Sequence, residues 1–382
     1  MAMTVGLLTP SWALLRSSSP SSFRHGGHSN NRQQQQLLLQ RKETVCGNAG
    51  ARCRKHKGQQ FCGIVGSHNA SVQARPRTVE KAAGEHKAER PDQKKKGVVI
   101  TGGSKGLGYA LAHQFLSYGH KVIICNRNED QLATALRTLQ AEHEGSIVYG
   151  MCCDVSNAAD VCAFASFAVE KLGIVDIWIN NAGEVTSKKI LADVEASEIV
   201  RVCGTNVIGS LLCCREAINV MRLQPLSELP IYHIFNMGFS QWGANFTKSS
   251  CTHKTTKVAL TQLTSSLSSE IQAAGLSSIG VHNLSPGMVL TDLLLKDSTV
   301  VARRFFNTLA EEPETVAASL APRILAVQGT RKSISYLSPA SAVLKVALGF
   351  PQIIQGGRFF DKNGNRVEVS GNQYQENGVR IR

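Results

Sequence analysis

Three glycines, Gly102, Gly106 and Gly108, lie in a Thr-Gly-x-x-x-Gly-x-Gly segment directly after the apolar run 98–101. Because glycine has no Cβ, the backbone amides of such a turn can approach a pyrophosphate closely. A helix beginning near 106 would add unpaired N–H groups and the positive end of its dipole. A strand, a glycine-rich turn and a helix in this order are what dinucleotide binding requires. The residues expected to contact the dinucleotide here are Thr101, Gly102, Ser104, Lys105, Gly106, Leu107 and Gly108.

Two cations favour a nicotinamide nucleotide that carries a 2′-phosphate. The second apolar run ends without Asp or Glu, the residues that usually hold the ribose 2′-hydroxyl of NAD. Arg127 lies where a 2′-phosphate would be placed, and Lys105 adds a second charge from the glycine turn. A guanidinium can grip phosphate in bidentate fashion. The pattern predicts NADPH as the cofactor; the alternative is that both cations are solvated surface charges.

Small and polar residues follow three later apolar runs. Asp154 and Val155 come after the third run, where a carboxylate could accept a hydrogen bond from the adenine amino group. Asn181, Ala182 and Gly183 come after the fourth run. Small residues there let the chain pass close beneath the cofactor, and asparagine amides can tie the loop to its neighbours. The loop after the sixth run, whose backbone could face the nicotinamide amide, contains Pro286, Gly287, Met288 and Thr291.

Alternating strands and helices must position these loops. Strands are predicted at 98–101, 121–125, 147–151, 176–179, 231–236 and 279–284, and helices near 106–118, 128–143, 157–172, 195–223 and 250–274. Strands that are apolar on both faces and alternate with helices indicate a parallel sheet covered on both sides. Right-handed crossovers then predict an α/β fold, a doubly wound Rossmann sheet in a single domain with a C-terminal extension. Its ligand crevice would lie at the carboxyl ends of the strands.

The positive charge of the chain is concentrated near its N-terminus. The formal net charge is +14, but residues 1–97 hold 17 Lys and Arg against 5 Asp and Glu, and the remaining residues hold 25 against 23. A nucleic-acid-binding body is therefore not indicated. The first 42 residues contain no Asp or Glu, which is typical of an organelle transit peptide, with a disordered tail as the alternative. We expect a leader and linker over 1–96, the folded domain over 97–354 and a tail over 355–382.

The eleven cysteines are scattered, and two pairs are adjacent in sequence. This spacing supports neither a disulfide framework nor a zinc site, so no metal is expected. No stretch approaches the roughly 18 consecutive apolar residues that indicate a membrane span.

The motifs and their order resemble the short-chain dehydrogenase/reductase family over about 97–295. Within that family, the segments 176–183, 209–217 and 282–294 resemble the chlorophyll(ide) b reductases of chloroplasts, and 313–323 extends the likeness. The chain looks closest to the NOL type, which lacks membrane spans. This resemblance implies NADPH-dependent reduction of the C7 formyl group of chlorophyll b or chlorophyllide b to a hydroxymethyl group, in chlorophyll breakdown.

The family's chemistry uses a serine, a tyrosine, a lysine four residues after the tyrosine and a supporting asparagine. Ser240, Lys257 and Asn206 match three of these positions, and Lys257 would also hold the nicotinamide ribose. The tyrosine position holds His253, and no tyrosine occurs within 233–335. The resemblance therefore implies a catalytic group of Asn206, Ser240, His253 and Lys257.

A histidine at this position changes the proton donor. Hydride addition to an aldehyde leaves an alkoxide, and a positioned acid is typically worth about 10²–10⁴ in rate. Protonated imidazole could donate a proton near neutral pH. It is shorter than tyrosine by roughly 2 Å, however, and a misplacement of about 1 Å can cost some 10²-fold. Lys257 would also disfavour a second cation. Nearby, 238–243 departs from the family, and Phe239 and Trp242 either line a pigment-sized pocket or only pack.

Three functions stay open on this basis: an active chlorophyll(ide) b reductase, a non-catalytic NADPH-binding subunit that stabilises an active homologue, and a reductase of another carbonyl compound. The resemblance implies the pigment, a homologous reductase subunit or a light-harvesting complex as partners, and the chloroplast stroma or the thylakoid surface as location. The apolar positions within 336–354 form either an interfacial helix that contacts thylakoid lipid or a core-packing helix.

Overall fold

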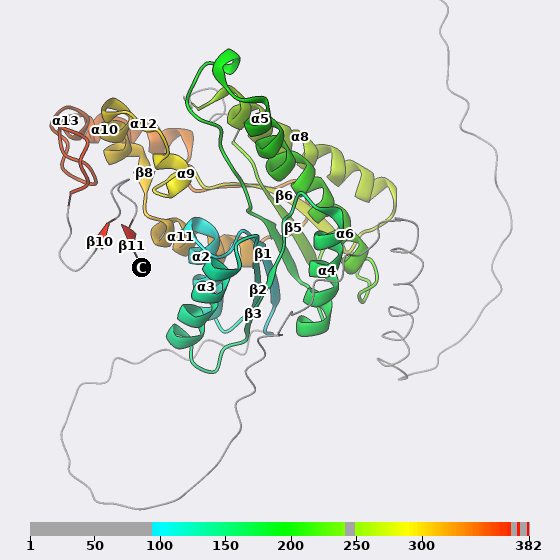
Figure 1. The fold of residues 1–382 in the computed structure, drawn as a ribbon. Coiled ribbons are helices and arrows are strands. Elements are labelled where there is room, and N and C mark those ends of the chain that lie inside the picture. Colours follow the sequence, from blue (N-terminus) through cyan, green and yellow to red (C-terminus); the bar gives the residue numbers. More distant parts are fainter. Residues whose placement is uncertain (1–93, 241–248, 368–372, 375–379, 382) are drawn as a thin grey trace, which may run out of the picture. The chain divides into compact units, whose positions relative to one another are not determined.

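A seven-stranded parallel sheet forms the centre of the protein, which we describe from a computed structural model (Figure 1). The structure describes residues 94–240, 249–367, 373–374 and 380–381. The chain divides into two units, Met1–His86 and Lys87–Arg382, and all described residues belong to the second. The sheet order is β3-β2-β1-β4-β5-β6-β9. The strands are β1 (Gly97–Thr101), β2 (Lys121–Asn126), β3 (Val148–Cys152), β4 (Ile177–Asn180), β5 (Tyr232–Met237), β6 (Ile279–Ser285) and β9 (Ser333–Ser335).

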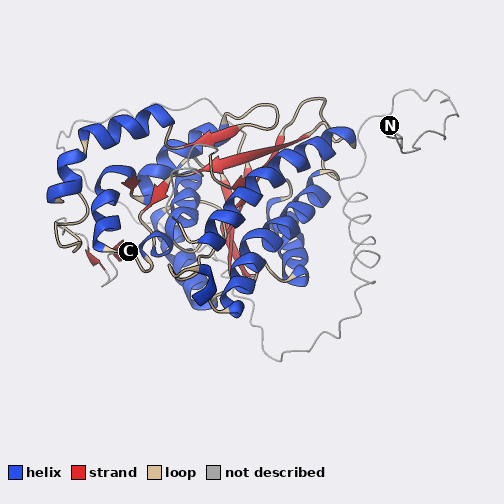
Figure 2. Cartoon of the chain, turned by 90° about the horizontal axis from the view of Figure 1, so that it is seen from above, coloured by secondary structure: helices blue, strands red, loops and turns tan. Residues whose placement is uncertain are grey.

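Helices cover both faces of this sheet (Figures 1 and 2). One face packs against α2 (Gly106–Ser117), α3 (Glu129–Glu142) and α11 (Pro313–Leu325). The other packs against α4 (Ala158–Leu172), α6 (Gly209–Met221) and α8 (Cys251–Ala273). Successive strand residues alternate between the two layers: Val98 and Ile100 belong to the first core, and Val99 to the second. Strands buried on both faces explain the unbroken apolar runs of the sequence.

The predicted fold class is confirmed, and the six predicted strands and five predicted helical segments are all present. The helical segment predicted at 195–223 consists of α5 (Ala196–Cys203), a π-helical turn η2 (Gly204–Ile208) and α6. The edge strand β9 was not predicted. It has three residues, and Ile334 is the buried one of its Ser-Ile-Ser sequence, so it lacks the apolar run by which the other strands were found.

A smaller set of elements follows β6. It comprises β7 (Met288–Val289), α9 (Asp292–Leu295), α10 (Val300–Leu309), β8 (Ala310–Glu311), α12 (Pro339–Leu348) and α13 (Phe350–Gln355), and a hairpin of β10 (Gln373–Tyr374) with β11 (Arg380–Ile381). Buried Asn307 fixes the chain after α13, because its Oδ1 accepts hydrogen bonds from the backbone of Phe359 (2.7 Å) and Phe360 (2.8 Å). The segment 336–354 thus holds two helices, and α12 leaves Val343 and Leu348 exposed.

One helical run in the described part of the chain, Ala196–Met221, is long and apolar enough to cross a membrane by length and composition, with a mean hydropathy of 1.2. It consists of α5, η2 and α6. Cys213, Ala217 and Met221 of this run are buried in the core between sheet and helices. Val200, Ile208 and Leu211 of the same run are exposed, so core packing accounts for only part of its apolar composition.

Candidate functional site

The loops after β1 and β4 are tied together at the carboxyl edge of the sheet. Thr101 Oγ1 accepts hydrogen bonds from the backbone N–H of Asn181 (3.1 Å) and of Ala182 (3.0 Å). Asn181 Nδ2 in turn donates to the carbonyl oxygens of Thr101 (2.9 Å) and Gly102 (3.1 Å). Two loops that are distant in sequence therefore form one rigid floor for the predicted cofactor groove.

The glycine turn packs too closely for side chains. A Cβ on Gly102, whose φ is +65°, would lie 2.9 Å from Ala182 Cα, and one on Gly108 would overlap Gly102 O and Asn181 Nδ2. Lys105 is the N-cap residue of α2 but makes no side-chain cap, so among the described residues no side chain caps the first turn of α2. The backbone N–H groups of this first turn are therefore available to bind a pyrophosphate. Val155, in the turn after β3, lines a narrow crevice together with Thr101 and Ala182 of this floor.

We expect Gly108→Ala to destabilise the protein by about 1–3 kcal/mol, the usual cost of forcing extra atoms into a packed site. Its Cβ would meet the Gly102 backbone as well as the Asn181 side chain, so a side-chain movement alone cannot relieve the overlap. The free energy of unfolding in urea measures the effect. Gly204→Ala is the matched control, because its Cβ would make an ordinary 3.7 Å contact with Ser156 Cβ. Equal stability of the two variants would contradict this account of the turn.

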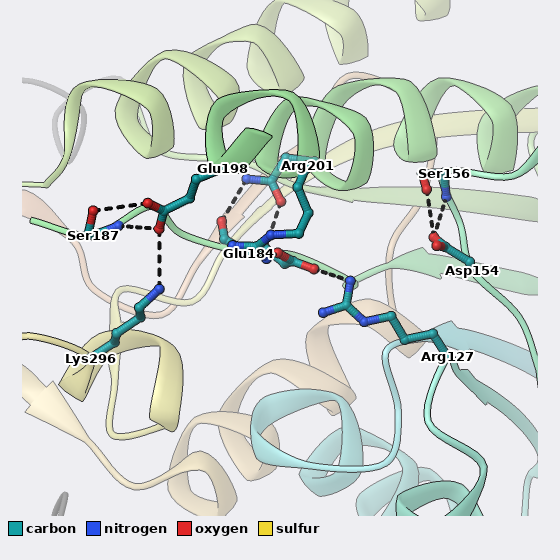
Figure 3. A network of polar contacts seen from close by, with 9 residues as sticks. Arg127, Asp154, Ser156, Glu184, Ser187, Glu198, Arg201 and Lys296 are labelled. Atoms are coloured by element: carbon teal, nitrogen blue, oxygen red, sulfur yellow. Dashed lines mark hydrogen bonds and ion pairs between the residues drawn. The ribbon is translucent and has the colours of Figure 1, made fainter. Parts of the chain in front are cut away.

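Both cations that were predicted to bind a 2′-phosphate are paired with carboxylates. Arg127 and Arg201 each form an ion pair with Glu184, whose two carboxylate oxygens contact one guanidinium each (Figure 3). These are charge contacts without aligned hydrogen bonds. Lys105 Nζ lies 2.8 Å from Asp292 Oδ2. Arg127 and Lys105 remain about half or more exposed, whereas the Glu184 side chain is 11% exposed.

The remaining predicted contacts on the adenosine side lie in ordered turns. Asp154 Oδ1 accepts hydrogen bonds from Ser156 N (2.9 Å) and Ser156 Oγ (2.8 Å), which fixes the turn after β3 (Figure 3). Ser104 Oγ accepts from Asn126 Nδ2, so the glycine turn is also joined to the end of β2. The carboxyl ends of β1, β2, β3 and β4 thereby present their loops together, as a doubly wound sheet requires.

The loop after β6 folds back toward the glycine turn. Gly287 has a φ of +75°, a left-handed conformation that favours glycine, and Met288 begins β7, which pairs with β8. A Cβ on Gly106 would lie 3.0 Å from Thr291 Cγ2. Pro286 lies between β6 and this turn. The structure therefore brings the predicted sixth-strand segment against the glycine turn.

Asn206 lies in the π-helical turn η2 and is fully buried. Its Oδ1 accepts from Glu184 N (2.8 Å), while its Nδ2 donates to Glu184 O (2.9 Å) and to Thr256 Oγ1 (3.0 Å). π-turns inside α-helices are frequent at functional sites. Asn206 thus joins the loop after β4 to helix α8, which carries the other predicted catalytic residues.

Lys257 is buried in α8, and its Nζ donates a hydrogen bond to Met237 O at 2.8 Å. Burial lowers the pKa of this lysine to about 8, because the charged ammonium loses its hydration. A Cβ on Gly183 would lie 3.5 Å from Lys257 Nζ and 3.4 Å from Asn206 Oδ1. Gly183, Asn206 and Lys257 therefore form one cluster.

His253 lies one turn before Lys257 and is 9% exposed. Its Nδ1 is 2.6 Å from Ser249 Oγ, and its ring meets the Phe239 ring edge-on at 5.6 Å. Its Nε2 is buried and has no hydrogen-bond partner among the described residues. Burial, followed by the charges of Lys257 and Lys188, lowers the pKa of His253 to about 3. Burial and these charges therefore favour the neutral imidazole near pH 7 over the imidazolium donor considered from the sequence.

Ser240 follows β5, and its backbone N–H donates to Ser285 Oγ at 3.1 Å. This bond joins the ends of β5 and β6. The Phe239 ring packs against the His253 ring and helps to hold the imidazole in place. Trp242 lies in 241–248, outside the described residues. Glu184, Arg201 and Ser249 were not among the residues predicted from the sequence. A charged Glu184 directly after the small residues 181–183 is the signal that could have indicated the first of these.

One group in the described part of the chain has metal-ligand composition: His113, Glu142 and His143, whose ligand atoms lie within 4.8 Å of one another. No metal site was predicted. His113 Nε2 lies 3.5 Å from Glu142 Oε2, and the two histidine rings meet edge-on at 4.4 Å. The three side chains thus contact one another directly at the surface between α2 and the end of α3.

Comparison with known proteins identifies the family to which this chain belongs. The sequence profile described as short chain dehydrogenase matches residues 96–299. The chain is 38% identical over 285 residues to the rice protein named probable chlorophyll(ide) b reductase NYC1, chloroplastic, covering 71% of this chain and 55% of that protein, or about half its length. It is 39% identical over 267 residues to chlorophyll(ide) b reductase NOL, chloroplastic, of Arabidopsis thaliana, covering 68% and 74%. A short chain dehydrogenase from Burkholderia cenocepacia, solved with NADP, shares the fold at 22% identity with a TM-score of 0.53, covering 63% and 96%.

Proposed function

The chain belongs to the short-chain dehydrogenase/reductase family, and from this premise we propose that it reduces the C7 formyl group of chlorophyll b or chlorophyllide b with NADPH. The product would be the 7-hydroxymethyl pigment. The observation that carries this proposal is the 39% identity to the Arabidopsis protein named chlorophyll(ide) b reductase NOL, which extends over 74% of that protein. The cluster of Gly183, Asn206 and Lys257, with His253 one helical turn before Lys257, supports it.

The residues around the carboxyl edge of the sheet fit NADPH. The uncapped amides of α2 would hold the pyrophosphate, Arg127 the 2′-phosphate and Lys257 the nicotinamide ribose. When bound, the nicotinamide supplies the hydride. A dianionic 2′-phosphate competes well with a monoanionic carboxylate for Arg127, so binding would release this arginine from Glu184 and leave Glu184 to Arg201.

The chain's own residues then orient and protonate the oxygen of the substrate. Ser240 would hold the formyl oxygen by a hydrogen bond, and the buried His253 Nε2 would face the same oxygen. A buried site strengthens such contacts, because little water competes with them. Burial and, to a smaller extent, Lys257 disfavour a positive imidazole, so His253 acts as a neutral donor.

The same relationship supports a chloroplast location, since the named relatives are chloroplastic. We propose residues 1–96 as transit peptide and linker, 97–354 as the reductase domain and 355–382 as a C-terminal tail. The proposed partners are the pigment and a homologous reductase subunit or light-harvesting complex. The exposed Val343, Leu344 and Leu348 of α12 support peripheral contact with thylakoid lipid.

A specific observation favours a second function. The family tyrosine is replaced by a histidine whose pKa is lowered by burial, which disfavours its protonated form near neutral pH, while the cofactor side keeps its expected residues. This combination fits an NADPH-binding subunit that supports an active homologue. Reduction of another carbonyl compound is the third candidate.

Purified protein with NADPH and chlorophyllide b separates these functions, with products resolved by chromatography. The proposed function predicts 7-hydroxymethyl chlorophyllide. Retained NADPH binding without product would support the subunit function, and turnover of small aldehydes without pigment turnover would support the third. His253→Tyr is expected to raise pigment turnover up to about 10²-fold, because the longer tyrosine side chain brings its hydroxyl to the substrate oxygen that the shorter imidazole does not reach. An unchanged rate would contradict the placement of the active site.

A further inference from the structure

We infer that Ser249 and His253 form an uncharged proton relay, in which Ser249 holds the imidazole in the tautomer that donates from Nε2. This inference rests on the proposed function for its role in turnover, but the tautomer itself is a property of the free protein. It assigns to Ser249 the part of a positioning residue.

The geometry comes from the start of helix α8. Ser249 directly precedes the N-cap residue Ser250, and its Oγ lies 2.6 Å from His253 Nδ1. The other ring nitrogen, Nε2, is buried and has no partner among the described residues. The Phe239 ring packs edge-on against the imidazole and limits its rotation. Nδ1 thus contacts Ser249, and Nε2 is left available to contact a substrate within the site.

Charge decides which form of the ring is useful there. Lys257 and Lys188 both disfavour a positive His253, and burial does so more strongly. A neutral imidazole carries one proton, on Nδ1 or on Nε2. If the Ser249 hydroxyl donates to Nδ1, the proton lies on Nε2, where it can be donated to an oxygen. If Ser249 accepted from Nδ1–H instead, Nε2 would present a lone pair, which repels an alkoxide.

The relay moves one proton at each step and never forms an imidazolium. As the hydride reaches the formyl carbon, the C=O double bond becomes a single bond and the oxygen gains the electron pair. That alkoxide takes the proton from His253 Nε2, while Nδ1 takes the hydroxyl proton of Ser249. Ser249, which is partly exposed, recovers a proton from solvent water. The ring ends in the other neutral tautomer. After product release, Nε2 takes a proton from water that enters the vacated site, while Nδ1 returns its proton to solvent through Ser249, so that no net charge is left on the ring.

Nuclear magnetic resonance of the full chain with ¹⁵N-labelled histidine tests the tautomer without any substrate. We expect the proton of His253 on Nε2 in the parent protein and in Ser249→Thr, which keeps the hydroxyl. Ser249→Ala should give a mixture of both tautomers. Ser250→Ala is the matched control, because its neighbouring hydroxyl is buried without a partner among the described residues. A proton on Nδ1 in the parent protein would overturn the inference.

Single-turnover reduction of chlorophyllide b tests the role in proton transfer. Ser249→Ala should slow product formation about 10-fold or more, with the Kd for NADPH unchanged and a larger solvent isotope effect, whereas Ser249→Thr should restore most of the rate. Product formation that is equally fast in Ser249→Ala and in the parent would refute the relay. If the parent makes no product, the proposed function fails, and the tautomer experiment still decides the inference.

Discussion

Lys257→Met is expected to stabilise the fold and to abolish reductase activity. The pKa of buried Lys257 falls from 10.5 to about 8, because burial penalises the charged ammonium. One pKa unit corresponds to about 1.4 kcal/mol, so keeping this lysine protonated at pH 7 costs the folded state roughly 3 kcal/mol. Methionine removes that charge while retaining most of the side-chain length. The free energy of unfolding should therefore rise by up to about 3 kcal/mol. The lost hydrogen bond to Met237 O, which contributes on the order of 1 kcal/mol, reduces this gain.

This gain in stability should depend on pH in a defined direction. Between the folded pKa of about 8 and the unfolded value of 10.5, the unfolded chain binds more protons than the native protein. The stability of the parent protein then rises with pH relative to the variant. The advantage of Lys257→Met is thus largest below pH 8 and vanishes toward pH 10.5. Urea unfolding at several pH values measures it.

Activity should move in the opposite direction. Without the ammonium group that we propose to hold the nicotinamide ribose, hydride transfer should fall by about 10² or more, because positioning of the reacting groups is lost. Lys254→Met is the control, because it removes an amine three residues earlier in the same helix and leaves the hydrogen bond between Lys257 and Met237 intact. A variant with the parent's stability and the parent's activity would contradict the account of Lys257.

The second large effect concerns Arg127 and Glu184. Arg127→Ala is expected to weaken NADPH binding about 10–100-fold, since contacts between a guanidinium and a phosphate contribute roughly 1.5–3 kcal/mol. The affinity for NADH, which lacks the 2′-phosphate, should change little. Glu184→Gln should do the reverse and tighten NADPH binding, because the carboxylate no longer competes for Arg127. Titration of both nucleotides against each variant measures these shifts.

Arg137→Ala provides a matched control for these titrations. Arg137 lies in α3, the helix that follows Arg127, and its guanidinium forms hydrogen bonds within that helix, to Ala133 and Thr134. It should bind both nucleotides as the parent does. Equal losses of NADPH and NADH affinity in Arg127→Ala would show that this arginine supports the fold of the turn and not the 2′-phosphate.

Most of the fold could be predicted because its signals are local. Apolar runs such as 98–101 and 121–125 identify strands that are buried on both faces, and the spacing of the helices between them fixes a parallel sheet. The strand β9 escaped detection because three residues with one buried side chain carry no periodic pattern. The division of 195–223 by a π-turn was also hidden, since a single extra residue in a helical turn leaves the apolar pattern nearly unchanged.

The candidate site was predictable only where motifs encode it. The glycine turn and Asn181 follow strands directly, and chain order places them at one edge of the sheet. Glu184, by contrast, contacts Arg127 and Arg201, which lie far from it in sequence, so these ion pairs depend on the tertiary fold. The protonation state of His253 also depends on burial and on Lys188, neither of which can be read from spacing along the chain.

Calorimetric titration of the purified full chain with NADPH and with NADH is the most direct test of the central claim, which is that the corner between β1 and α2 binds a phosphorylated nicotinamide nucleotide. The account predicts one saturable site per chain for NADPH and at least about tenfold weaker binding of NADH, the effect of one charge-assisted contact. The absence of saturable NADPH binding, or equal affinity for the two nucleotides, would contradict it.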